Sequence, residues 1–166
     1  MNHSLTYLFE TLAQLVDNNA QSEVEMLFEK WPILSEATRG DTSALRIVRD
    51  DIKMLKIALK YGVNPDLRDS VGNTLLMDSS GIGDFDQVEI LLEYAADVNA
   101  QNCSGESPLS IAVARGNVEI AVKLMKAGAD IAINVGGVNL GVWADLSGSV
   151  KMQTWIYDQF KKRDIT

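Results

Sequence analysis

The sequence has few of the residues from which catalytic and metal sites are usually built. Its 166 residues include one cysteine and one histidine. The single cysteine excludes an internal disulfide and is compatible with a reducing compartment. No run of about 18 apolar residues is present, which is the length that a membrane-spanning helix needs. The N-terminal segment lacks the basic residues of a signal peptide and carries Glu10 inside its apolar stretch. We therefore expect a cytoplasmic protein that does not contact a membrane.

Recognisable catalytic motifs are also missing. The sequence contains no G-x-S-x-G, H-E-x-x-H or C-x-x-C motif and no phosphate-binding glycine loop. His3 lies close to the N-terminus, and Cys103 has no histidine or basic cluster near it in the sequence that would activate the thiol. We expect a protein that is not an enzyme and that binds neither a metal nor a cofactor. A carboxylate-based enzyme or small-ligand binder remains an alternative, because acid–base catalysis needs only two well-placed acids.

Lysine and arginine are absent from residues 69–114, although this stretch contains eight acidic residues. Because such a stretch repels phosphate, we expect no nucleic-acid partner. The same charge would attract a basic protein, and the alternative is a solvated face that only keeps the chain soluble. The eight acids are Asp69, Asp78, Asp84, Asp86, Glu89, Glu93, Asp97 and Glu106.

Residues 78–89, "DSSGIGDFDQVE", have part of the ligand spacing of an EF-hand calcium loop. Asp78 would be ligand 1 and Glu89 ligand 12, with the required glycine, Gly83, at position 6. Ile82 at position 5 cannot bind a cation, and the preceding "NPDLRDSVGN" is a poor entering helix because it contains proline and glycine. We therefore predict that a helix ends here at Ser80, that Gly81 to Gly83 form a turn, and that a second helix starts at Asp84.

The chain contains an internal repeat of 33 residues. Gly83 aligns with Gly116, and Gly62 aligns with Ala95 and Gly128, always at this spacing. Short apolar segments recur between the glycines with the periodicity of amphipathic helices. A repeat of this length indicates a solenoid, in which each unit buries its apolar face only by stacking on its neighbours.

The segment "GESPLSIAVARGNVEIAVKLMKAGAD" resembles an ankyrin repeat. The resemblance is clear over about residues 50–134, with departures at Leu75, Met77 and Ala95, where the family favours proline, histidine and glycine. Physical chemistry accounts for the pattern. Thr74 and Ser107 can cap the first helices, whereas Gly83 and Gly116 permit the tight turns.

The resemblance implies an all-α solenoid of about five stacked helix-turn-helix units with short β-hairpin-like loops. We expect one domain, 1–166, with degenerate capping units at 1–35 and 135–166 and repeats at 36–68, 69–101 and 102–134. Helices are expected at 4–17, 21–30, 36–50, 139–147 and 149–162. Trp143 occupies a position where the interior repeats have a small residue, so the last pair is expected to pack differently.

Ankyrin repeats imply a non-catalytic scaffold that binds another protein through hairpin tips and the groove-facing side of the first helices. A narrower hypothesis is an immunity-type protein that neutralises a basic toxin or enzyme. We expect a monomer with a protein partner that could be basic. Arg49 extends the candidate surface. The partner-binding candidates are Arg68, Ser70, Val71, Asn73, Asp78, Gly81, Ile82, Tyr94, Gln101, Cys103, Ser104, Glu106, Ala114, Arg115 and Trp143.

Overall fold

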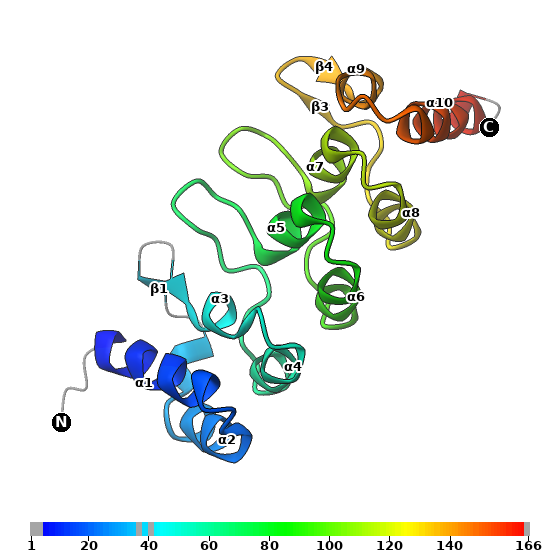
Figure 1. Ribbon diagram of the computed structural model, residues 1–166. Helices are drawn as coiled ribbons and strands as arrows, with labels where there is room; N and C mark the ends of the chain where they lie inside the picture. The colour runs from blue at the N-terminus through cyan, green and yellow to red at the C-terminus, as the bar shows by residue number, and fades with distance from the viewer. Residues whose placement is uncertain (1–4, 36–37, 40–41, 165–166) are drawn as a thin grey trace.

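The computed structural model describes residues 5–35, 38–39 and 42–164. These residues form ten α-helices, one 3-10 helix and two short antiparallel strand pairs (Figure 1). The mostly helical architecture confirms the predicted all-α fold. The N-terminal elements are α1 (Leu5–Asp17), α2 (Gln21–Lys30), η1 (Pro32–Ser35), β1 (Thr38–Arg39), β2 (Thr42–Ser43), α3 (Ala44–Val48) and α4 (Ile52–Lys60). They are followed by α5 (Leu75–Ile82), α6 (Phe85–Glu93), α7 (Pro108–Arg115), α8 (Val118–Lys126), β3 (Asn134–Val135), β4 (Val138–Asn139), α9 (Leu140–Leu146) and α10 (Val150–Asp164).

The helices lie in two parallel layers. Figure 1 shows the odd-numbered helices on the side of the hairpins and long loops, with the even-numbered helices on the opposite side. We call the odd-numbered helices the first layer and the even-numbered helices the outer layer. Contacts follow the layers: α5 packs on α7 and α7 on α9, whereas α4, α6 and α8 pack in sequence in the outer layer. One buried apolar cluster runs from Leu8 in α1 to Ile156 in α10. Each helix pair therefore relies on its neighbours to bury its apolar face, as a solenoid requires.

Polar side chains begin the helices where the sequence predicted them. The Thr74 hydroxyl accepts a hydrogen bond from the Met77 amide at the start of α5. Ser107 and Ser110 form a reciprocal capping box at the start of α7. Asp84 caps α6 by accepting from the Gln87 amide at 3.0 Å. These caps satisfy amides that have no partner within the helix, and so they fix the register of the helices.

Small side chains allow α5 and α7 to pack closely. Ser80 of α5 and Ala112 of α7 are fully buried. The Ser80 hydroxyl donates to the Leu76 carbonyl at 2.6 Å, so it is buried without an unsatisfied polar group. A Cβ atom at Gly81 would lie 3.1 Å from Cγ2 of Ile111. The small residues therefore set the separation of the two helices that form the floor of the candidate site.

Two local predictions are corrected by the structure. The helix expected over residues 36–50 is only α3, because Ser43 has an extended backbone and caps a helix that starts at Ala44. The β1–β2 pair precedes it, and residues 36–37 and 40–41 lie outside the described residues. Gly81 and Ile82 belong to α5 and not to the turn, since the helix ends at Gly83 with a left-handed φ of 93°. The stretch 78–89 is therefore a helix-turn-helix corner.

The two terminal helix pairs have the predicted positions. α1 and α2 correspond to 4–17 and 21–30, although residue 4 lies outside the described part. α9 and α10 correspond to 139–147 and 149–162. No helix in the described part of the chain is long and apolar enough to cross a membrane. The division into caps and repeats with the boundaries given above stays a prediction.

Candidate functional site

A groove of about 840 Å³ lies between the long loops and the first-layer helices. It collects side chains from six parts of the chain: the end of α3, the two loops before α5 and α7, and helices α5, α7 and α9. Eight of the fifteen predicted residues line it, together with Arg49. The lining is Arg49, Asn73, Met77, Asp78, Gly81, Ile82, Glu106, Ile111, Ala114, Arg115 and Trp143.

The groove lining includes several apolar side chains. The Ile82 side chain, at the end of α5, is 75% exposed. Ile111 and Ala114 on α7 lie beside it, and Trp143 on α9 is half-buried. The Nε1 atom of Trp143 is buried and has no hydrogen-bond partner among the described residues. An exposed aliphatic side chain in a groove that also contains an aromatic ring provides apolar surface that is buried when another protein binds.

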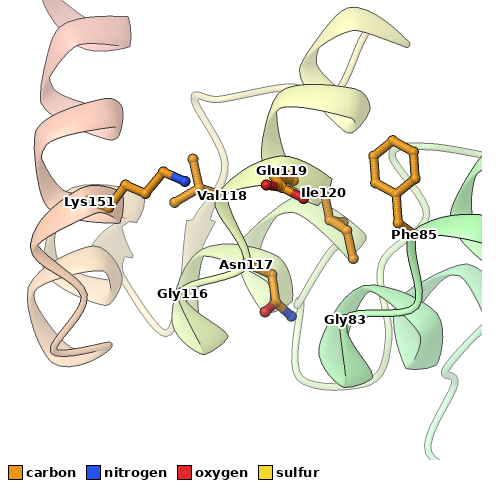
Figure 2. A pocket seen from close by; sticks show the side chains of 8 residues that line it. All are labelled: Gly83, Phe85, Gly116, Asn117, Val118, Glu119, Ile120 and Lys151. Atoms are coloured by element: carbon orange, nitrogen blue, oxygen red, sulfur yellow. The ribbon is translucent and has the colours of Figure 1, made fainter.

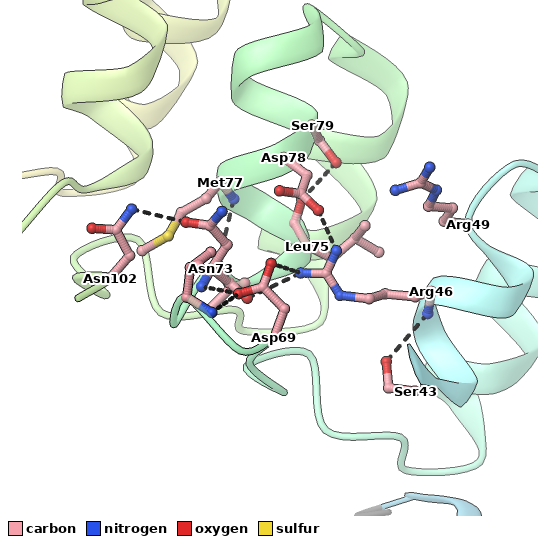
Figure 3. Close-up of polar contacts among 12 residues, drawn as sticks. Ser43, Arg46, Arg49, Asp69, Asn73, Leu75, Met77, Asp78, Ser79 and Asn102 are labelled. Carbon is pink, nitrogen blue, oxygen red and sulfur yellow. Dashed lines mark hydrogen bonds and ion pairs between the residues drawn. The ribbon is translucent and has the colours of Figure 1, made fainter. Parts of the chain in front are cut away.

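Asp78, at the edge of the groove, forms an ion pair within the protein. Arg46 of α3 donates through Nη1 to Asp78 Oδ2 and through Nη2 to the Asn73 carbonyl at 3.0 Å (Figure 3). The same guanidinium lies 3.4 Å from Asp69 Oδ2. All three charged side chains are largely buried, with exposed fractions between 12% and 21%. The charge of Asp78 is therefore partly compensated before any partner arrives, because Arg46 is shared with Asp69.

The loop residues of the predicted surface are mainly engaged with one another. Asn102 donates through Nδ2 to Asn73 Oδ1 and to Glu106 Oε2, both at 2.8 Å. Arg68 donates to the Gln101 carbonyl at 2.5 Å and to the Gly72 carbonyl at 3.1 Å. These bonds join the loop before α5 to the loop before α7. Arg68, Asn73, Gln101 and Glu106 thus hold the shape of the groove wall.

The other predicted residues are distributed over two places. Ser70, Val71, Cys103 and Ser104 are exposed at the loop tips, where the Cys103 amide donates to the Val71 carbonyl at 3.0 Å. They extend the wall of the groove without lining it. Tyr94 follows α6 in the outer layer and does not line the groove.

The acidic residues of the middle repeats do not converge on the groove. Asp84 caps α6, Glu89 pairs with Lys123 at 2.5 Å, and Asp97 accepts from the Asn99 amide in a loop. Of the eight acids, Asp78 and Glu106 line the groove, and two arginines line it as well. The acidic composition of residues 69–114 therefore does not give the groove an acidic lining.

Two tyrosines outside the groove have raised pKa values. Burial, followed by the charges of Glu25 and Glu29, raises the pKa of Tyr61. The hydrogen bond to Asp145 is the main cause that raises the pKa of Tyr157. Both hydroxyls are therefore neutral at pH 7 and act as hydrogen-bond donors. No group of three or more potential metal ligands occurs among the described residues.

Sequence reasoning missed three residues of this region. Met77 and Ile111 line the groove, and Arg46 lies behind its edge. The helical spacing of Ile111 relative to Ala114 and Arg115 was a usable signal, since residues three and four apart share a helix face. Arg46 had no comparable signal, because it lies in the degenerate unit around α3 and its partner Asp78 is 32 residues away.

A family model described as "Ankyrin repeats (3 copies)" matches residues 42–135, more than half of the sequence. The chain belongs to the ankyrin-repeat family. Ankyrin repeats are generally protein–protein interaction modules and are typically non-catalytic. The matched range includes all groove residues except Trp143.

Three relatives illustrate how widely this ankyrin-repeat sequence type is distributed. The inactive serine/threonine-protein kinase TEX14 of Bos taurus is 32% identical over 110 residues, 66% of this chain and 7% of that protein. The DNA replication inhibitor plutonium of Drosophila melanogaster is 30% identical over 93 residues, 52% of this chain and 53% of that protein. The putative ankyrin repeat protein FPV232 of fowlpox virus is 41% identical over 66 residues, 39% of this chain and 13% of that protein. This ankyrin-repeat chain thus spans less than a tenth of TEX14.

Proposed function

We propose that the protein is a non-catalytic scaffold that binds one segment of a partner protein in the groove between its loops and first-layer helices. The observation that carries this proposal is the exposed Ile82 side chain in the lining of the groove. This aliphatic side chain is 75% exposed, so a partner that covers it removes apolar surface from water, which favours binding. Ile111 and Trp143 would complete the apolar contact, and Arg115 would position the segment at one edge.

The groove lining favours a partner with an apolar anchor over a uniformly basic one. Arg49 and Arg115 offset Asp78 and Glu106 in formal charge, and Arg46 already pairs with Asp78. A basic toxin as partner stays a prediction from composition alone. The charged side chains of such a mixed lining orient a bound segment, and the apolar side chains contribute most of the affinity.

The proposal is tested by site-specific photocrosslinking in the cells that express the protein. A benzophenone amino acid replaces Ile82 in one variant, Ala114 in a second and Ile33 in a control. Ile33 is 55% exposed and lies in η1, outside the groove. We expect the same protein to be crosslinked from both groove positions, to be identified by mass spectrometry, and not to be crosslinked from Ile33.

Affinity measurements with the purified partner complete the test. Ile82→Glu is expected to weaken binding by at least about tenfold, equivalent to about 1.4 kcal/mol. Ile33→Glu introduces the same charge elsewhere and is expected to leave the affinity within twofold. Equal effects of the two substitutions, or crosslinks from Ile33 alone, would place the binding surface outside the groove and refute the proposal.

A further inference from the structure

A second hollowed surface lies on the outer layer, on the opposite side of the helices from the loops. Three adjoining hollows of about 250, 810 and 430 Å³ share Val118 of α8 and Lys151 of α10. Figure 2 shows Lys151 extending from α10 toward Val118, with Phe85 of α6 on the other side. We call this surface the outer valley and define it by Phe85, Val118, Val122, Lys126, Lys151 and Trp155.

The outer valley exposes apolar surface. Phe85 at the start of α6 is 38% exposed, and Trp155 on α10 is half-buried. Val150 and Tyr157, which line the same hollow as Trp155, are 73% and 45% exposed. α10 packs mainly on α9, and the hollow between α8 and α10 is lined by Val118 of α8 and Trp155 of α10. A terminal helix of a solenoid normally has a polar outer face. The outer valley side of α10 instead carries Val150, Trp155 and Tyr157.

The rim of the outer valley is basic. Lys126, Lys151 and Lys161 form no ion pair with any side chain that the structure describes. Lys123 is different, because it pairs with Glu89 at 2.5 Å and lies over the Phe85 ring. Two acids also lie on the rim. Asp158 pairs with Lys162, whereas Glu119 forms no ion pair with any described side chain. A chain with a net charge of −8 thus carries a locally cationic surface here.

We propose that the outer valley is a second docking site and that it binds an acidic amphipathic helix of a partner protein. The apolar stripe of such a helix would lie against Val118 and Trp155, and carboxylates on either side would pair with Lys126 and Lys151. The concave shape suits a helix, whose anchors recur at three- and four-residue spacing, better than a flat lipid surface. The site is separate from the groove and independent of the function proposed for it.

Two designed peptides of about 18 residues test this proposal. They share one leucine stripe at positions i, i+3, i+4 and i+7, and their flanking residues are all glutamate in one peptide and all lysine in the other. Each is titrated into the 15N-labelled full chain, and amide and indole shifts are recorded. We expect the glutamate peptide to bind saturably and to shift Val118, Lys151 and the Trp155 indole, whereas the lysine peptide leaves them unchanged.

A charge-reversed variant and a matched control make the result specific. Lys126→Glu/Lys151→Glu is expected to weaken binding of the glutamate peptide about tenfold and to reduce its salt dependence. Lys53→Glu/Lys56→Glu changes the net charge equally on exposed positions of α4, outside the outer valley, and should leave the affinity within about twofold. Both variants are checked for native folding by circular dichroism.

Several results would overturn the proposal. They include no saturable shift up to about 1 mM peptide, equal binding of the two peptides, and shifts confined to Ile82 and Trp143 in the groove. Binding to phosphatidylserine vesicles that depends on Lys126 and Lys151, without peptide binding, would replace the protein helix by a membrane surface. Lysine-dependent dimerisation in sedimentation velocity, again without peptide binding, would replace it by a second copy of the chain.

Discussion

At the scale of single residues, the acids of the middle repeats stabilise the fold more than they shape a binding face. Asp69 and Asp78 share the guanidinium of Arg46, and Asp69 Oδ1 also accepts from the Asn73 amide at 2.7 Å. Asp84 caps α6 and also accepts from Gln87 Nε2 at 2.8 Å. The residue type alone determines that each of these side chains is negatively charged. The partner of each acid depends on which segments the fold brings together.

Ala95 offers a test at this scale, because it adopts a left-handed conformation with φ of 61°. The equivalent Gly62 and Gly128 have φ of 83° and 96°. A non-glycine residue pays about 1–2 kcal/mol in this region, and glycine costs about 0.5–1 kcal/mol more entropy on folding. Ala95→Gly is therefore expected to raise the free energy of unfolding by about 0.5–1 kcal/mol, measured by urea denaturation.

The matched control for Ala95 is Ala127, the C-cap residue of α8. Ala127 is also exposed but has a right-handed conformation with φ of −82°. Ala127→Gly relieves no strain and increases the entropy of the unfolded chain, so it should lower stability by about 0.5–1 kcal/mol. If both substitutions change stability in the same direction, the strain assigned to Ala95 is absent.

At the scale of elements, equivalent corners of the solenoid meet different surroundings. Gly83 and Gly116 both end first-layer helices with left-handed φ, of 93° and 75°. A Cβ at Gly83 would meet Asn117 at 3.6 Å, an ordinary contact. A Cβ at Gly116 would lie 3.0 Å from the Ser149 Cβ, just before α10. The second corner therefore carries both the backbone requirement and the packing of the last helix pair.

Alanine substitution separates these two contributions. Gly83→Ala is expected to cost about 1 kcal/mol, because only the backbone is strained. Gly116→Ala should cost about 2–3 kcal/mol and should also increase hydrogen exchange in α10, because Ser149 must move. Denaturant unfolding and amide exchange measure the two effects. Equal costs with unchanged exchange in α10 would contradict the role of the contact with Ser149.

At the scale of the whole molecule, the stacked units form a quasi-one-dimensional assembly. The apolar cluster is continuous, but each unit contacts mainly its immediate neighbours. In such an assembly the interior units are supported on two sides and the end units on one. Local stability should therefore decrease from the α5–α8 region toward α1–α2 and α9–α10.

Two leucine truncations test this gradient. Leu109 in α7 and Leu12 in α1 are both fully buried. Leu109→Ala should lower global stability by about 3 kcal/mol, with faster exchange throughout α5–α8. Leu12→Ala should increase exchange in α1 and α2 while α7 stays protected. Uniform loss of protection in both variants would indicate a single cooperative unit in place of a graded solenoid.

Much of the fold could be predicted from local signals. Ser107, Pro108 and Gly116 mark the beginning and end of α7 by rules that act within one helix. The degenerate unit around α3 was predicted less well, since a helix over 36–50 was expected and five residues are helical. For the candidate site, the resemblance to ankyrin repeats identified Ile82 and Arg115 as surface candidates. It also included Tyr94, which lies in the outer layer. A periodic pattern assigns a residue to a helix and does not specify which side chains converge across helices.

The sequence by itself determined the repeat length, the helix caps and the excess of acid in residues 69–114, because each depends on residue identity and short-range geometry. The tertiary structure decided where charge and apolar surface are used. It brought Arg46 to Asp69 and Asp78 across more than 20 residues of sequence, and it left Ile82 exposed in the groove. It also placed unpaired lysines around Val118 on a chain of net negative charge. The physical reason is that ion pairing and burial depend on distances of a few ångströms between segments, which only the packed solenoid defines.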